Sequence, residues 1–160
     1  MSEVRFTAFV KPEPQGSSRA FIVKGQWGKA DRAVVTSDNK DLKSFRSEVT
    51  REALQAIAAA NHPRPMAAKH IPVSIELDFY FQKPPSISKK RTEMVVRPDA
   101  DKCIRSCLDS CTGVLYEDDA QVVSIVARKH YGTPERVEVK AAIGAVIQSA
   151  AQPEMAGTLF

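Results

Sequence analysis

The most regular alternation of apolar and polar residues runs from position 71 to position 82. Successive side chains of a β-strand point to opposite faces, so this segment predicts a strand with one face on the core. The other face carries Glu76 and Asp78, which lie either near a binding site or simply in solvent. The apolar face comprises Val73, Ile75, Leu77, Phe79 and Phe81.

Looser alternation predicts further strands bounded by turn-forming residues, over 4–10, 20–23, 33–36, 120–131 and 136–146. The connection 25–32 predicts a hairpin, and Gly132, Thr133 and Pro134 predict an antiparallel hairpin between the last two strands. Near the tip of the first hairpin, Lys24, Lys29 and Arg32 are placed to contact a phosphate backbone, although such residues are more often simply solvated.

Apolar residues at steps of three and four predict an amphipathic helix over about 39–60, with Ser37 or Asp38 as its N-cap. Pro63 ends it, and His62 reads as a polar residue of the helix terminus rather than a catalytic base. A second helix follows Asp101. It carries Cys103, Cys107 and Cys111, whose spacing by four predicts a buried stripe of reduced thiols. A zinc site is not indicated, because the sequence has no paired CxxC unit or nearby His to supply the remaining zinc ligands.

A length of 160 residues with 43% hydrophobic residues is typical of one globular domain. We expect that domain to cover residues 1–147 and a poorly ordered tail to cover 148–160. The sequence has no apolar run near the ~20 residues that span a bilayer, and its start lacks the apolar region of a secretory signal. We therefore expect a cytoplasmic protein.

Two pairs of aspartates bracket the second helix. Asp99 and Asp101 precede it, and Asp118 and Asp119 follow it. Close carboxylates repel one another, so this arrangement favours a hard divalent cation held by oxygen ligands. Capping of the helix explains one aspartate of the first pair but not both. Arg105 lies on the same helix edge as Asp101.

Basic residues lead into the first aspartate pair along a loop that is long for a compact domain. The net charge of +4 permits a polyanionic partner without requiring one. A basic segment beside an acidic site suits an enzyme acting on phosphodiesters, and a solvated flexible loop is an equally good interpretation. His130 reads as a surface residue of a strand end rather than a catalytic group. The basic residues are Lys83, Lys89, Lys90, Arg91 and Arg97.

The segments 97–101, 108–109 and 116–122 together resemble the RusA family of Holliday junction resolvases. That family has a D-x-D pair opening a helix, an L-D near the helix end and a D-D-x-Q-V run leading into the next strand. This chain has Arg97-Pro98-Asp99-Ala100-Asp101, Leu108-Asp109 and Tyr116-Glu117-Asp118-Asp119-Ala120-Gln121-Val122 in the same order.

The resemblance implies a homodimeric α/β (α+β) fold, with a small mixed sheet packed on two helices, in a bacterial or phage-encoded protein. It implies that Asp99, Asp101 and Asp119 hold Mg²⁺ or Mn²⁺, with Asp118 as a supporting ligand, during cleavage of four-way DNA junctions. The family has an Asn at the position of Lys102 and a Lys at that of Arg105.

This departure bears directly on catalysis. Arginine stays protonated and cannot transfer a proton, although it binds phosphate and stabilises developing negative charge. If a proton must be transferred, Lys102 has to supply it. Our hypothesis is a metal-dependent endonuclease whose 83–97 loop binds DNA. The alternatives are a catalytically weak or inert protein that binds branched DNA, and a metal-binding structural protein.

The chain ends in two large apolar residues, Leu159 and Phe160. This end is similar to the Leu-Phe finish of peptides that dock on the bacterial replication sliding clamp, although the Gln usual in that motif is missing. Packing on the domain's own surface, or no role, are the other interpretations.

Overall fold

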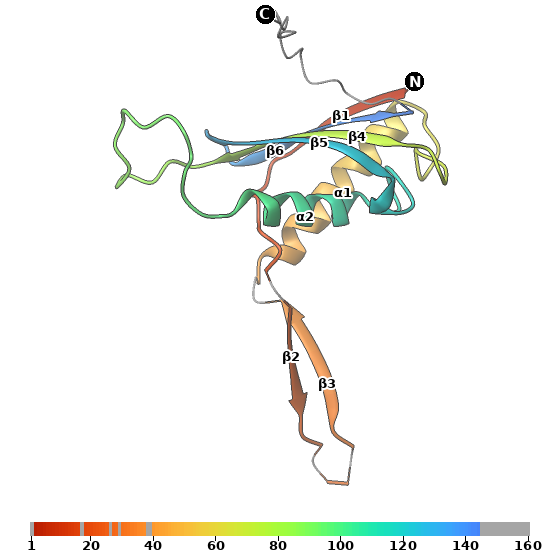
Figure 1. The fold of residues 1–160 in the computed structure, drawn as a ribbon, viewed down its shortest axis with the longest axis vertical. Helices are drawn as coiled ribbons and strands as arrows, with labels where there is room; N and C mark the ends of the chain where they lie inside the picture. The colour runs from red at the N-terminus through yellow and green to blue at the C-terminus, as the bar shows by residue number, and fades with distance from the viewer. Residues whose placement is uncertain (1, 17, 26, 29, 38–39, 145–160) are drawn as a thin grey trace, which may run out of the picture.

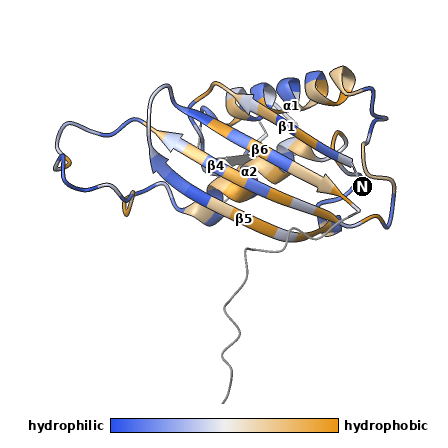
Figure 2. Ribbon diagram, turned by 90° about the horizontal axis from the view of Figure 1, so that it is seen from above, coloured by the Kyte–Doolittle hydropathy of each residue, from blue (hydrophilic) through white to orange (hydrophobic). Residues whose placement is uncertain are grey.

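The computed structural model describes residues 2–16, 18–25, 27–28, 30–37 and 40–144. Within them, two helices cover one face of a mixed four-stranded sheet (Figures 1 and 2). A separate two-stranded hairpin projects from the body (Figure 1). This is the α+β architecture that the sequence predicts. The elements are β1 (Ser2–Ala8), β2 (Ser18–Val23), β3 (Arg32–Ser37), α1 (Leu42–Ala59), β4 (Val73–Phe81), α2 (Ala100–Cys111), a 3₁₀ turn (Asp119–Gln121), β5 (Val122–Tyr131) and β6 (Arg136–Ile143).

Strand β4 lies inside the sheet, whose strand order is β1-β6-β4-β5. Its predicted apolar face is fully buried, from Val73 to Phe81. The apolar positions of α1, including Phe45 and Val49, are buried in the same core. Alternation in the strand and helical spacing in α1 therefore meet at one interface, which confirms both predictions.

The predicted hairpin between 120–131 and 136–146 is wrong. Strand β5 pairs with β4 in parallel, and β6 lies on the other side of β4, antiparallel to both β4 and β1. The connection crosses the end of β4, where Gly132 N donates to Phe81 O at 2.9 Å and Gln82 N donates to Glu135 Oε1 at 3.1 Å. Turn residues indicate where a chain reverses, but they do not select the strand beside which it returns.

The hairpin of β2 and β3 is confirmed, and its register runs from the pair Ser18 and Ser37 to the pair Val23 and Arg32. The N-cap prediction for α1 is wrong, because Ser37 ends β3 and α1 begins only after Asp41. Asp38 and the tail, with its Leu159 and Phe160, lie outside the described residues.

The three cysteines of α2 are free and buried, as their spacing predicts. Burial raises the pKa of Cys103 to about 12, so this thiol stays protonated and unreactive at neutral pH. Among the described residues, no helix is both long and apolar enough to cross a membrane.

Candidate functional site

Asp99 and Asp101 stand at the start of α2, where unpaired backbone N–H groups favour negative charge. Asp99 is the N-cap residue, but its side chain makes no capping hydrogen bond. Its Oδ2 instead accepts a hydrogen bond from Lys102 Nζ at 3.0 Å. This bond, followed by the charge of Lys102 and then those of Arg97 and Lys129, lowers the pKa of Asp99. Asp99 is therefore an ionised carboxylate facing several cations.

Lys129 anchors the segment that leads into this helix. It lies in β5 beside the buried Phe79 of β4, and its Nζ donates to the carbonyls of Val96 and Pro98, both at 2.8 Å. Its position follows Ile125 and Ala127 on one face of the strand. Sequence analysis overlooked this residue, and the available signal was a lysine in phase with apolar residues.

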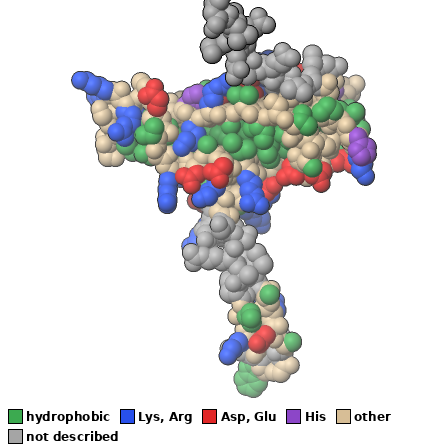
Figure 3. Space-filling model, viewed as in Figure 1, with side chains coloured by type: hydrophobic (Ala, Val, Ile, Leu, Met, Phe, Trp, Pro, Cys, Tyr) green, Lys and Arg blue, Asp and Glu red, His purple; other side chains and the backbone are tan. Residues whose placement is uncertain are grey.

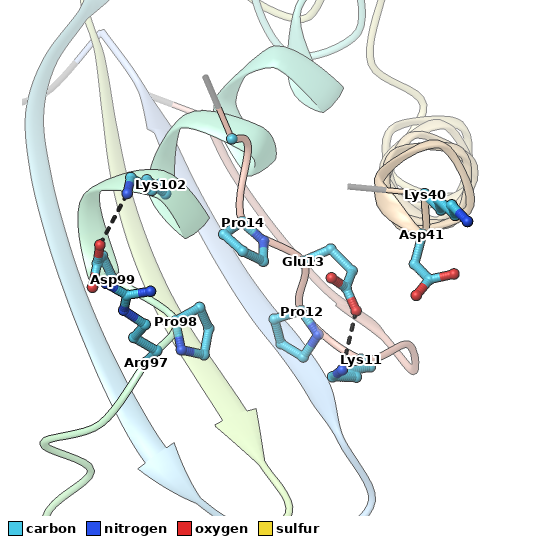
Figure 4. Close-up of a pocket in the computed structure, with 11 residues that line it drawn as sticks. Lys11, Pro12, Glu13, Pro14, Lys40, Asp41, Arg97, Pro98, Asp99 and Lys102 are labelled. Carbon is cyan, nitrogen blue, oxygen red and sulfur yellow. Dashed lines mark hydrogen bonds and ion pairs between the residues drawn. The ribbon is translucent and has the colours of Figure 1, made fainter. Parts of the chain in front are cut away.

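A hollow of about 730 Å³ opens beside Asp99 (Figure 4), and we call it the α2 hollow. Its walls come from the segment after β1, the residues before α1 and the start of α2. Ser106 Oγ donates to Glu13 O at 2.6 Å and Gln15 N donates to Lys102 O at 3.0 Å, which fastens the first wall to the helix. The charged lining residues are Lys11, Glu13, Lys40, Asp41, Arg97, Asp99 and Lys102.

Glu13 is a site residue that sequence analysis missed. It is only 8% exposed, and its carboxylate pairs with Lys11 Nζ at 3.3 Å. Four cations and three carboxylates thus line the α2 hollow. The sequence offered only a weak signal, because Glu13 lies between two prolines in a segment that reads as a turn. The mixed lining can hold a phosphate group next to carboxylates.

The second aspartate pair lies just beyond the other end of α2. Asp118 caps the 3₁₀ turn, with Oδ1 accepting from Ala120 N at 2.8 Å. Gln121 completes this capping box, because its Oε1 accepts from the backbone N–H groups of Glu117 and Asp118. Its Nε2 donates to the carbonyls of Ala68 and Ile71 at 2.9 and 3.1 Å. Much of the D-D-x-Q motif therefore has a structural role.

One chain does not bring the predicted metal ligands together. Helix α2 spans 12 residues, about 18 Å at 1.5 Å per residue, between the two aspartate pairs. Among the described residues, no group of three or more His, Cys, Asp or Glu side chains is placed to hold a metal ion. The carboxylates of Asp101 and Asp119 are exposed and make no hydrogen bond or ion pair with any described residue. The ligand set remains a prediction.

Of the remaining charged residues of α2, one forms an ion pair and one is exposed to solvent without a partner among the described residues. Asp109, on the edge of the apolar face, pairs with Arg46 of α1 at 3.1 Å. Arg105 is exposed and has no hydrogen-bond or ion-pair partner among the described residues. Lys102 is already paired with Asp99, so Arg105 is the more available cation for a bound phosphate.

The basic loop extends from one end of the sheet, between β4 and α2 (Figure 1). Lys83 turns back onto the loop, donating to the carbonyls of Lys89 and Arg91 at 3.2 and 2.6 Å. It also lies over the Tyr131 ring, 5.5 Å from the centroid. Lys83 therefore holds the loop in shape. The side chains left exposed are Lys89, Lys90, Arg91 and Arg97.

Glu76 and Asp78 lie on the sheet face opposite the core. This position agrees with the interpretation that they face solvent rather than a binding site. Arg128 Nη1 contacts Glu76 at 2.8 Å, and His130 Nε2 lies 2.6 Å from Asp78 Oδ1. His130 also stacks on the ring of Tyr80. These residues form an ion-pair network separate from the α2 hollow.

Comparisons with known proteins agree with this arrangement. The family model described as Endodeoxyribonuclease RusA matches residues 12–142, which include α2 and both aspartate pairs. The chain is also 30% identical over 149 residues to the uncharacterised protein YqaN of Bacillus subtilis (strain 168). That alignment covers 87% of this chain and 95% of the relative. The chain belongs to the RusA endodeoxyribonuclease family.

Proposed function

We propose that the protein is a metal-dependent DNA endonuclease that resolves four-way junctions, with its reacting phosphodiester at the start of α2. The observation that carries this proposal is the ionised Asp99 in a hollow that also presents Lys102 and Arg97. Asp101 lies two residues further along, in the first turn of the same helix. Cations there bind the DNA backbone, while the carboxylates are the ligand type that Mg²⁺ and Mn²⁺ prefer.

The basic residues around the α2 hollow position the DNA. Lys11 and Lys40 lie across it from Arg97, so a backbone entering the hollow meets positive charge on more than one wall. The exposed Lys89, Lys90 and Arg91 extend this basic surface along the loop. Contacts of this kind give affinity and register but read little sequence. We therefore expect the enzyme to select DNA shape.

The residues that would hold the metal are Asp99 and Asp101, together with Asp119. Asp118 is the weaker candidate, because its carboxylate already caps the 3₁₀ turn. A bound metal would supply an activated water and offset negative charge on the phosphate. Arg105 adds a fixed positive charge one turn after Asp101 and stabilises the developing charge without transferring a proton.

A homodimer offers a way to join the two separated aspartate pairs. Strand β5 is at the edge of the sheet and exposes Val123 and Ile125. Among the described residues, its free edge pairs with other backbone at one isolated bridge, between Glu93 and His130. Edge strands readily pair with a second chain. Antiparallel pairing of two β5 strands would bring Asp119 of each copy toward the Asp99 end of the other. Two such sites fit the two cuts that resolution requires.

The test is a cleavage assay with Asp101→Asn and, as a matched carboxylate control, Glu52→Gln on α1. Each protein is incubated with a labelled four-way junction, a fork and a linear duplex, with and without Mg²⁺. We expect wild type and the control to place symmetric nicks in the junction only when Mg²⁺ is present. Asp101→Asn should bind the junction and leave it intact.

Full cleavage by Asp101→Asn would refute the assignment of this site. Selective binding of the junction by the wild type, with no nick under any metal condition, would support the alternative of an inert protein that binds branched DNA. The departures at Lys102 and Arg105 are the features of the sequence that favour this alternative.

A further inference from the structure

The hairpin of β2 and β3 forms an arm that stands away from the body of the protein (Figures 1 and 3). Its strands pair with each other and not with the main sheet. Each strand has six residues, so the arm is about 20 Å long at roughly 3.3 Å per residue. Stability of the main core does not require such a projection, which points to an external partner.

The tip of the arm presents a tryptophan to solvent. Trp27 is 98% exposed, and both Trp27 and Gly28 have positive φ values, of 60° and 76°. Asp31 Oδ1 accepts a hydrogen bond from Gly25 N at 2.9 Å, which ties the two sides of the tip together. Left-handed backbone is uncommon for a residue other than glycine, and a fully exposed indole leaves a large apolar surface without a partner.

The charge of the arm identifies the chemistry of that partner. Between positions 18 and 37, four basic residues stand against one acidic residue, so this segment holds three of the chain's four net positive charges. Lys24 and Arg32, on either side of the tip, are exposed. An aromatic ring flanked by cations matches a nucleic acid, which offers a base to stack on and phosphates beside it. Two such arms would repel each other.

The root of the arm is the wall of the α2 hollow. Residues 11–16 lead into β2, and β3 leads to Lys40 and Asp41, so the chain lines the hollow both before and after the arm. DNA held beside Asp99 therefore passes the base of the arm. A length of about 20 Å corresponds to roughly six base steps at 3.4 Å each. The arm can reach a feature of the DNA some distance from the cleaved bond.

We propose that this arm recognises the branch point of the DNA substrate. Trp27 stacks on a base that lacks a stacking neighbour, and Lys24 and Arg32 contact the flanking phosphates. Within a continuous duplex both faces of each base are already stacked, so Trp27 finds no open face there without disrupting the helix. At a branch such faces are open. This inference rests on the proposed function, because its ligand is the DNA substrate.

The single tryptophan of the chain makes the test direct, since intrinsic indole fluorescence reports on Trp27 alone. The full-length protein is titrated with a four-way junction or a linear duplex of equal length, in EDTA so that neither is cut. Affinities of wild type, Trp27→Ala and the arm control Ile22→Ala are measured by anisotropy of labelled DNA. Circular dichroism and thermal melting verify that each variant folds.

We expect the junction to quench Trp27 strongly and the duplex to quench it little. One base stack is worth about 1–3 kcal/mol, so Trp27→Ala should weaken junction binding roughly tenfold while duplex binding changes less than about twofold. Ile22→Ala should match wild type for both DNAs. Trp27→Phe should fall between the two, because phenylalanine keeps a smaller stacking surface.

Each other outcome overturns the inference in a distinguishable way. One outcome is that the protein binds the junction selectively, but its fluorescence does not change and Trp27→Ala binds as tightly as wild type. That outcome would refute the proposed role of the arm and leave the proposed function standing. Conversion of a dimer to a monomer by Trp27→Ala, with DNA binding intact, would show that the arm contacts a second copy. Failure of every DNA to bind would refute the proposed function together with the arm.

Discussion

The two ends of α2 carry the same residue type but use it differently. At the start of the helix, Asp99 makes no capping bond and faces cations that lower its pKa. Beyond the other end, Asp118 caps a 3₁₀ turn that Gln121 fastens to the neighbouring loop. At the first end neither carboxylate caps the chain, whereas the second end uses Asp118 as a cap and leaves Asp119 exposed. Two aspartates of one motif can therefore differ in whether their side chains already hold the chain in place.

The largest difference between the ends should appear in cleavage. Asp99→Asn removes a charged candidate ligand but keeps the shape of the side chain, so we expect junction cleavage to fall at least about 100-fold. Asp118→Asn keeps an oxygen that accepts from Ala120 N, and we expect it to retain most activity. Initial rates with saturating Mg²⁺ measure both. Equal losses in the two variants would show that both ends are catalytic.

The order of these effects should reverse for stability. Gln121→Ala removes four hydrogen bonds from the second end, and we expect it to lower the free energy of unfolding by about 2–3 kcal/mol. Asp99→Asn alters an exposed side chain and weakens one surface ion pair, so we expect its free energy of unfolding, measured in urea, to fall much less than that of Gln121→Ala. A Gln121→Ala protein as stable as the wild type would contradict the structural role given to the second end.

Lys129 offers a finer test, because it supports the first end without being one of its proposed ligands. Lys129→Met keeps most of the length of the side chain but leaves the carbonyls of Val96 and Pro98 without its hydrogen bonds. We expect a loss of about 1–3 kcal/mol in stability. The variant should also need more Mg²⁺ for half-maximal cleavage, because the segment before Asp99 loses its anchor. If the Mg²⁺ concentration for half-maximal cleavage did not change, Lys129 would contribute to stability but not to metal binding.

Local patterns in the sequence predicted the helices and strands of this fold, but they did not predict the contacts between segments that are far apart in the chain. The alternation of β4 and the spacing of α1 are set by which side chains face the core, so the sequence displays them directly. The neighbour of β5 depends on where the chain crosses after Gly132, and alternation is the same whichever strand lies alongside. The roles of Glu13 and Lys129 could not be predicted from local patterns for a related reason. They reach the site through bonds that join segments far apart in the chain.

The D-x-D motif shows the same limit within a single helix. The sequence placed Asp99 and Asp101 correctly at the start of α2, and helical geometry put Arg105 on the same edge. Whether the carboxylate of Asp99 caps the helix or meets Lys102 depends on side-chain conformation, which spacing does not fix. The third proposed ligand is Asp119, which a single chain holds beyond the far end of the helix.

The smallest effect concerns the ionisation of Asp99 itself. Lys102 is the main cause of its lowered pKa, so Lys102→Ala should return the pKa of Asp99 toward its ordinary value. Because the folded pKa lies below the unfolded one, the stabilisation from this pair is present above the ordinary carboxyl pKa and is lost as pH falls through the lowered value. Carboxyl ¹³C chemical shifts measured between pH 2 and pH 6 follow the titration, with Lys43→Ala on α1 as the control. If the Asp99 pKa in Lys102→Ala stayed where it is in the wild type, the ion pair would not be what keeps this carboxylate ionised, and the contrast between the ends of α2 would then rest on the helix terminus and the remaining cations.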